Sequence, residues 1–317
     1  MAASKRPDEL YIVRVYDAPV DAVWDAWTDS AQVAQWWGPR GFTLTTHSKD
    51  LRPGGQWTYT MHGPDGVDYP NNTVYHEVVR HQRLVYDHGG NIDRPPLFHV
   101  TVEFTELKGK TRMEMTMRCP TAAEAEATRQ FIKQANGNST WDRLAEYLSD
   151  QTGGEDIFVI NRSFKAGIDT VFEMWANPQH LQQWMGPAGS SMALIESDVR
   201  EGGGLRYGMT NAAGLAMYGR IRYLKINRPH LLVYTQSFSD PEGRISKPPF
   251  APTWPDAMLT MVTFAEEGPA ETRVTVQWSV YGDATDAERR TFHDAKSGMT
   301  GGWTGSFDKL EEVLAQR

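Results

Sequence analysis

Four side chains in the first half of the chain have the types and spacing that acid–base chemistry requires. Tyr75, Glu77, Tyr86 and His88 lie at alternate positions in two segments that show the apolar alternation of β-strands. If both strands belong to one sheet, these side chains share a face beside a half-apolar pocket. A carboxylate and an imidazole in such a pocket have shifted pKa values and can act as general acid and base. Glu77 and His88 are therefore the catalytic candidates if the protein is an enzyme, and ordinary polar residues if it is not.

Other motifs add no chemistry to this set. The glycine runs at 54–55 and 202–204 lack the GxxxxGK[ST] pattern of a phosphate loop, and we interpret them as turns or bulges. The chain has no GxSxG nucleophile elbow, and we expect no cofactor. Six of the nine histidines lie in the first half without a close-spaced pair such as HExxH, so we expect no metal site. They are His47, His62, His76, His81, His88 and His99.

The composition excludes several classes of protein. The 317 residues include 32 Lys and Arg against 40 Asp and Glu, and the net charge of −8 disfavours nucleic acid and anionic membranes as partners. A single cysteine, Cys119, excludes an internal disulfide and a cysteine-rich zinc site. Residues 1–10 lack the apolar segment of a signal peptide, and no run of about 18 apolar residues predicts a transmembrane helix. We therefore expect a cytoplasmic protein without a membrane span.

The chain consists of two copies of one sequence. Residues 14–39 (RVYDAPVDAVWDAWTDSAQVAQWWGP) align with residues 162–187 (RSFKAGIDTVFEMWANPQHLQQWMGP) at a shift of 148. The shift holds without a gap from Arg14 to Tyr86, with 22 identities in 73 positions. A period of this length indicates a duplicated domain rather than a solenoid.

A linker and an insertion define the domain boundaries. Residues 149–155 (SDQTGGE) are short and polar, so copy one spans 1–152 and copy two spans 153–317. Each copy is long enough to bury its own core. Copy two also carries an extra segment, 241–255, with five prolines. This segment has two interpretations that we regard as equally good: a lid or partner-binding loop, or a connection that packs on its own domain.

The order of elements within a copy predicts an α+β domain. A first strand at 10–18 precedes two short helices that end near Trp37, and a run of antiparallel strands follows as far as 118. Capping boxes at 121–124 and 285–288 begin a long helix in each copy, expected over 121–148, with an interruption near 136–138, and over 285–314. A helix that crosses a curved antiparallel sheet leaves a space that can hold a ligand.

This order and these motifs resemble the START-like superfamily of helix-grip domains, also called SRPBCC. The branch named for the activator of the heat-shock-protein-90 ATPase is the most similar. The resemblance rests on AxxxVWDAWTD…VAQWWGP at 18–39, on its counterpart at 166–187, and on Gly-Gly-x-x-x-Tyr and Arg-x-x-x-Leu-Val-Tyr strands in both copies. It implies two tandem helix-grip domains. Each would have a curved antiparallel sheet, two short helices and a long C-terminal helix that enclose a cavity.

The C-terminal helices differ between the copies. In copy two, Gly302-Trp303 precedes Phe307 and Leu310, as the resemblance implies. In copy one we align Gly137 with this tryptophan and Trp141 with the phenylalanine. A glycine in place of a tryptophan predicts a roomier cavity in copy one.

Helix-grip domains bind lipids and hormones, cyclise polyketides, assist chaperones or sense ligands, so the fold leaves the function open. We favour binding of a small apolar or aromatic molecule, one per domain, because aromatic residues occupy the expected inner strand faces. The alternatives are a cyclase- or hydrolase-type enzyme in the copy-one pocket and a co-chaperone or other partner-binding module, and the oligomeric state is open. Strand parity predicts the ligand-binding residues Trp57, Tyr59, Met61, Tyr75 and Tyr86 in copy one and Tyr207, Met209, Tyr223 and Tyr234 in copy two. Phe131 and Phe292 are added because the helices expected to cross these strands would point them toward the pocket.

Overall fold

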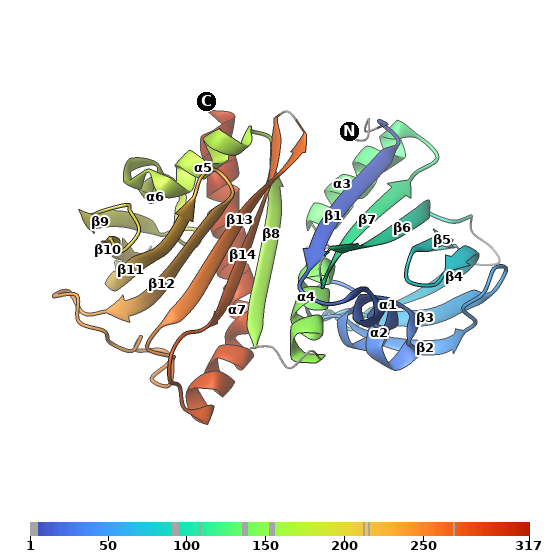
Figure 1. Cartoon of the computed structure of the whole chain (residues 1–317), viewed down its shortest axis with the longest axis horizontal. Helices are drawn as coiled ribbons and strands as arrows, with labels where there is room; N and C mark the ends of the chain where they lie inside the picture. Colours follow the sequence, from blue (N-terminus) through green and yellow to red (C-terminus); the bar gives the residue numbers. More distant parts are fainter. Residues whose placement is uncertain are drawn as a thin grey trace. The chain divides into compact units, whose positions relative to one another are not determined.

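Two compact units, Met1–Gly154 and Glu155–Arg317, make up the chain (Figure 1). The computed structural model describes all residues except 1–5, 91–94, 108, 135–138, 152–155, 212, 215 and 269. Each unit contains a seven-stranded antiparallel sheet with helices packed on it, which confirms the predicted α+β fold of two tandem helix-grip domains. The predicted boundary between residues 152 and 153 lies outside the described residues.

The two sheets have the same strand order. In copy one the order is β1-β7-β6-β5-β4-β3-β2, so each hairpin pairs with the next and β7 returns to pair with β1. In copy two the order is β8-β14-β13-β12-β11-β10-β9. The copy-one strands are β1 (Glu9–Tyr16), β2 (Thr43–Lys49), β3 (Gln56–His62), β4 (Asp68–Val79), β5 (Arg83–His88), β6 (Phe98–Leu107) and β7 (Lys110–Arg118). The copy-two strands are β8 (Ile157–Phe164), β9 (Ser191–Ser197), β10 (Gly204–Thr210), β11 (Ala216–Asn227), β12 (Leu231–Ser239), β13 (Met258–Gly268) and β14 (Glu271–Val280).

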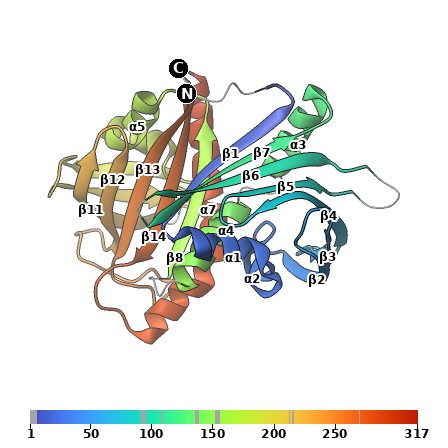
Figure 2. The ribbon, with the colours of Figure 1, turned by 45° about the vertical axis from the view of Figure 1, so that its right-hand side comes forward.

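Two short helices follow the first strand of each copy, and the C-terminal helices pack on the sheet. In copy one, α2 lies beside β2, as Figure 2 shows. The Asp29 carboxylate caps α2 by accepting hydrogen bonds from the amides of Ala31 and Gln32, and Asn177 caps α6 similarly. The helices are α1 (Val20–Thr28), α2 (Ser30–Trp36), α3 (Ala122–Gln134) and α4 (Ser139–Gln151), and in copy two α5 (Ile168–Ala176), α6 (Pro178–Trp184) and α7 (Asp286–Ala315).

The tryptophans of the two WxGP motifs fix these short helices in the core. Trp36 and Trp184 are fully buried, and their indole nitrogens donate to the carbonyl oxygens of Ala26 at 2.9 Å and Met174 at 2.8 Å. Gly38, which follows α2, has φ of +97°, a conformation that glycine adopts without strain. The repeated motif therefore ends the second short helix and, through the tryptophan hydrogen bond, attaches it to the first.

Arg143 of α4 holds the turn after α2 in copy one. One guanidinium nitrogen lies 2.9 Å from the carbonyl oxygen of Gly38, 3.1 Å from that of Pro39 and 3.2 Å from that of Phe42. The other donates to the carbonyl oxygen of Gln35 at 2.9 Å. Because carbonyl groups at a helix end have no partner within the helix, this arginine satisfies that of Gln35 in α2, together with three carbonyl groups of the turn that follows.

The stacking of two tryptophans corrects the predicted alignment of the C-terminal helices. Trp141 stacks on Trp27 with ring centroids 5.7 Å apart, and Trp303 stacks on Trp175 with centroids 5.8 Å apart. Trp27 and Trp175 are equivalent residues of the repeat, so Trp141 is the counterpart of Trp303 and not of Phe307. The pairing of Gly137 with Trp303 is therefore wrong. Gly137 itself lies outside the described residues, and the predicted difference in cavity size loses its basis.

The proline-rich insertion packs on its own domain. Trp254 is 9% exposed and lies 6.4 Å from Phe292 of α7, measured between ring centroids, whereas Phe250 is 69% exposed. Lys247 reaches the start of α7, where its ammonium nitrogen lies 2.6 Å from the Glu288 carboxylate. The insertion thus extends the copy-two core and is anchored by an ion pair.

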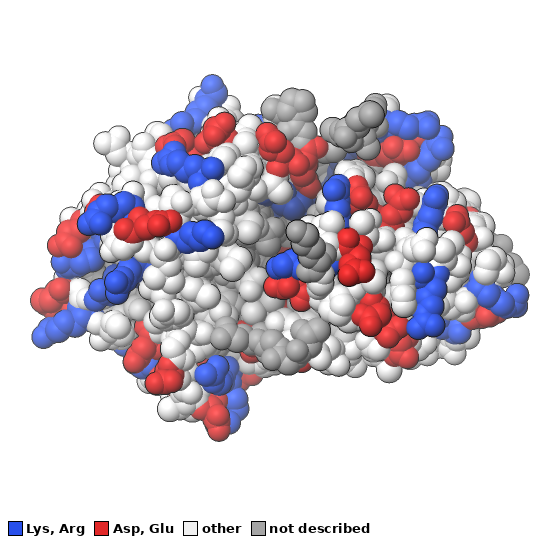
Figure 3. Space-filling view, in the orientation of Figure 1, with Lys and Arg blue, Asp and Glu red and all other residues white. Residues whose placement is uncertain are grey.

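Charges of both signs are mixed over the face shown in Figure 3. No helix among the described residues is both long enough and apolar enough to cross a membrane.

Candidate functional site

Three tyrosines lie together on the inner face of each sheet. In copy one they are Tyr59 on β3, Tyr75 on β4 and Tyr86 on β5, with exposures of 1%, 4% and 4%. Tyr75 and Tyr86 are direct cross-strand partners, and their rings meet edge to face at 6.1 Å. We call this set the copy-one tyrosine triad.

Copy two repeats this set at equivalent positions, as Tyr207, Tyr223 and Tyr234, which we call the copy-two tyrosine triad. Tyr223 and Tyr234 are again cross-strand partners, with ring centroids 5.9 Å apart. Tyr223 and Tyr234 are buried, and Tyr207 is partly buried against the same core. The arrangement is therefore a property of the repeated fold and not of one copy.

Burial keeps the triad hydroxyls protonated. It raises the pKa of Tyr207 to about 12 and raises the pKa of Tyr75 further, because an ionised phenolate is poorly solvated in the interior. The pKa of Tyr86 rises chiefly through burial and also through electrostatic interaction with Tyr59 and Tyr75. At neutral pH each hydroxyl can both donate and accept a hydrogen bond.

Copy one adds an imidazole to its triad. His88, at the end of β5, is half-buried and stacks on Phe98 with ring centroids 5.0 Å apart. Its Nδ1 atom lies 3.5 Å from the Tyr59 hydroxyl oxygen. Burial lowers the pKa of His88 to about 4, so the ring is neutral at neutral pH. Gln236 occupies the equivalent position in copy two.

Glu77 does not lie with His88, which corrects the acid–base pair expected from the sequence. The pairing between β4 and β5 shifts by one residue between Tyr75 and Glu77, so Tyr75 pairs with Tyr86 but Glu77 pairs with Val85. This bulge turns Glu77 to the outer face, where its carboxylate lies 3.7 Å from Arg83 and is 45% exposed. The expected alternation assumed an unbroken strand.

A second bulge brings in a residue that sequence reasoning missed. The pairing of β2 with β3 shifts between Thr46 and Ser48, which turns Lys49 inward opposite Trp57. Its ammonium nitrogen lies 3.0 Å from the carbonyl oxygen of Trp27 and 4.3 Å from the centre of the Trp57 ring. Burial lowers the pKa of Lys49 to about 7. Strand parity gave no signal for this residue, because the bulge reverses the parity.

The remaining predicted residues fall into three groups. Trp57 and Phe292 are buried in the cores of their copies. Met61 is partly buried against the copy-one core, and Met209 is of intermediate exposure near the end of β10. Phe131 is 68% exposed, so its predicted inward position is wrong. Counted from the capping threonines, the counterpart of Phe292 is Thr128, and Phe131 falls in the last turn of α3.

Known proteins give a consistent family match. The family model for "Activator of Hsp90 ATPase homolog 1-like protein" matches residues 17–149 and 165–315. A search of curated proteins gave no match.

Several solved structures are similar to this chain. A protein from Nitrosomonas europaea is 22% identical, with a TM-score of 0.43, over 47% of this chain and 99% of that one. A protein from Arthrobacter aurescens is 24% identical, with a TM-score of 0.43, over 47% of this chain and 93% of that one. The di-domain ARO/CYC BexL is 14% identical, with a TM-score of 0.38, over 96% of this chain and 97% of that one.

Proposed function

The chain belongs to the family of activator of Hsp90 ATPase homolog 1-like proteins, and we propose that it binds a small apolar or aromatic molecule in the interior of each copy. The ligand would lie between the inner face of the sheet and the C-terminal helix or helices. The tyrosine triads carry this proposal.

The physical argument rests on the repetition of three hydroxyl groups among apolar side chains. Each copy places three tyrosines on the inner face, while neighbouring inner positions differ: Trp57 and Thr73 of copy one correspond to Leu205 and Ile221 of copy two. Within the described residues, the triad hydroxyls are not among the buried polar atoms that lack a hydrogen-bond partner, so the fold is stable without a ligand on them. A ligand that accepts hydrogen bonds from the triad would be oriented by hydroxyl groups that both copies keep at the same positions.

The same chemistry defines the class of ligand. Aromatic and aliphatic side chains surround the triad in each core, which favours an apolar or aromatic body. Protonated tyrosine hydroxyls favour a carbonyl or hydroxyl group on that body. We therefore propose a neutral, largely aromatic ligand with at least one hydrogen-bond acceptor.

The bulge in β4 counts against the enzyme hypothesis. With Glu77 on the outer face, His88 has no carboxylate partner from the predicted pair. A neutral imidazole with a pKa of about 4 is a weak base at neutral pH. His88 is better suited to orient a ligand through a hydrogen bond, which would let copy one and copy two prefer different ligands.

The experiment uses the full chain and prodan, a neutral naphthyl ketone whose emission reports its surroundings. We expect saturable binding with blue-shifted emission. Tyr75→Phe removes one triad hydroxyl from copy one and keeps the ring, and Tyr223→Phe is its match in copy two. Each should weaken prodan binding in its own copy about fivefold, the contribution of one neutral hydrogen bond of about 1 kcal/mol. Absence of saturable binding, or full affinity in the double variant, would overturn the proposal.

A further inference from the structure

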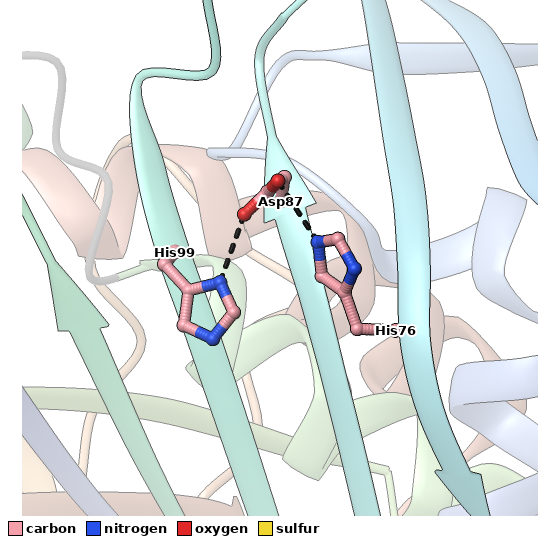
Figure 4. Close-up of side chains that lie close together, drawn as sticks. All are labelled: His76, Asp87 and His99. Carbon is pink, nitrogen blue, oxygen red and sulfur yellow. Dashed lines mark hydrogen bonds and ion pairs between the residues drawn. The ribbon is translucent and has the colours of Figure 1, made fainter. Parts of the chain in front are cut away.

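Three metal-binding side chains meet on the outer face of the copy-one sheet, on the opposite side from the tyrosine triad. They are His76 on β4, Asp87 on β5 and His99 on β6, on three adjacent strands (Figure 4). The Asp87 carboxylate lies between the two rings, 2.9 Å from Nε2 of His76 and 2.8 Å from Nδ1 of His99. The ring centroids are 5.6 Å apart.

The backbone explains why these residues converge. Asp87 and His99 are direct cross-strand partners, so their side chains project from the same face. His76 is the extra residue of the bulge between Tyr75 and Glu77, and the bulge directs its ring toward Asp87. Residues far from the HExxH spacing are thereby brought into one cluster, which the sequence alone did not indicate.

The distances suit a single small cation. One donor atom from each residue can be chosen so that all three lie within 4.8 Å of one another. An ion bound at 2.0–2.2 Å from each donor would draw the donors to within about 4 Å. The two imidazoles are each 46% exposed, so small rotations of the rings can bring the donor atoms to the shorter separation that a bound ion requires.

The local electrostatics also favour a cation. Asp87 supplies the one carboxylate of the cluster, within 2.9 Å of a ring nitrogen of each histidine. Arg118 on β7 is the cross-strand partner of His99, and its guanidinium lies 3.2 Å from the Asp8 carboxylate. The ion pair with Asp8 reduces the electrostatic repulsion between Arg118 and a bound metal ion.

We propose that His76, Asp87 and His99 bind one divalent transition-metal ion of the zinc class. Two imidazole nitrogens and one carboxylate oxygen are a donor set that zinc prefers, whereas calcium and magnesium prefer oxygen ligands alone. Three protein ligands leave a fourth position open to water on this exposed face. The site is independent of the interior ligand, because it lies on the other side of the sheet.

Copy two provides a matched control within the same chain. Its β11–β12 pairing has the same bulge, with Leu224 at the position of His76. Thr235 and Leu259 are cross-strand partners in β12 and β13, as Asp87 and His99 are in β5 and β6. The backbone is thus repeated without the ligands, so copy two should not bind the metal.

Isothermal titration of the full chain with zinc chloride tests the proposal. We expect one equivalent of zinc to bind. Replacing the cluster by its copy-two residues (His76→Leu, Asp87→Thr, His99→Leu) should abolish binding. The single substitution Asp87→Asn should weaken zinc binding at least tenfold. It provides an independent test if the triple variant does not fold. Transplanting the ligands into copy two (Leu224→His, Thr235→Asp, Leu259→His) should raise the stoichiometry to two.

His62→Ala is the surface control, since His62 lies 2.6 Å from Asp68 in an exposed contact that contains only one histidine and one carboxylate. It should leave zinc binding unchanged. Two results would overturn the proposal: no saturable binding near one equivalent, or binding that persists in both Asp87→Asn and the triple variant. In the second case the zinc binds elsewhere, and the cluster is only a hydrogen-bonded trio.

Discussion

Trp27 and Trp141 stack face to face across the copy-one core, with ring centroids 5.7 Å apart and ring planes 14° apart. Trp175 and Trp303 form the same stack in copy two, with planes 17° apart. The stack joins the first helix of each copy to its C-terminal helix. Trp141 lies 20 residues after the capping Thr121, but Trp303 lies 18 residues after Thr285. The core is therefore preserved although the preceding segments differ in length.

Trp141→Ala and Trp303→Ala should destabilise their copies to a similar extent. Both side chains are buried, with exposures of 7% and 6%. Loss of a buried tryptophan leaves a cavity and costs about 3–5 kcal/mol. Urea unfolding of the full chain, followed by circular dichroism, measures both effects. A much smaller cost for Trp141→Ala would show that the two tryptophans are not equivalent.

Arg143→Met should destabilise copy one by about 2–3 kcal/mol. The substitution keeps an apolar chain but leaves the carbonyl oxygens of residues 35–42 without their charged donor. Arg52→Met is the control, because Arg52 forms an ion pair with Asp50 in which both side chains are largely exposed. Such surface pairs contribute less than about 1 kcal/mol. Equal effects of the two variants in urea unfolding would argue against a role of Arg143 in holding the turn.

His88 should make copy one less stable in mild acid. Its pKa of about 4 in the folded chain is below the ordinary histidine value of about 6.5. As the pH falls from about 6.5 to 4, the unfolded chain takes up a proton that the folded chain does not. Stability is therefore lost across this window, by at most about 3 kcal/mol. His88→Gln, which copies Gln236, should remove this loss. If the free energy of unfolding falls equally in the parent chain and in His88→Gln over this pH range, His88 is not the cause of the loss.

The ionised Glu288 carboxylate should stabilise the folded state of copy two, and this stabilisation should be lost only in acid. Hydrogen bonds from Lys247 and from Thr285 lower the pKa of Glu288 to about 2, below its ordinary value. Because the folded pKa is depressed, the stabilisation is complete above about pH 4.5 and is lost as the pH falls toward 2. In Glu288→Gln the stability difference from the parent should shrink as the pH is lowered from 5 to 3. A constant difference would mean that ionisation of Glu288 does not contribute.

The repeat predicted two copies of one domain, and the resemblance of its motifs to helix-grip domains implied the fold. The sequence pattern predicted two short helices and a run of antiparallel strands in each copy, and the capping boxes marked the starts of α3 and α7. Strand parity also placed Trp57, Tyr59, Tyr75 and Tyr86 on a buried face, because these strands are regular up to Tyr75.

Bulges account for most of what the sequence could not predict. A single extra residue reverses the parity of all that follows it in a strand, and neither bulge has a glycine or proline to mark it. For this reason Glu77 was assigned to the wrong face and Lys49 was missed. Plain alternation already places His76, Asp87 and His99 on the outer face, but their cluster also depends on the register of three strands, which the sequence did not supply. The predicted inward position of Phe131 was wrong for a different reason. The direction of a side chain on the helix depends on its spacing from the capping residue and not on whether it is apolar.

Filling one interior at a time gives the most direct test of ligand binding in both copies. Val100 pairs with Tyr86, and Thr260 is its counterpart beside Tyr234; both are fully or almost fully buried. The full chain should bind two equivalents of prodan. Val100→Trp and Thr260→Trp should each reduce this to one, provided that circular dichroism shows a folded chain. Binding that is absent from the parent, or unchanged in the folded double variant, would contradict a ligand site in the interiors.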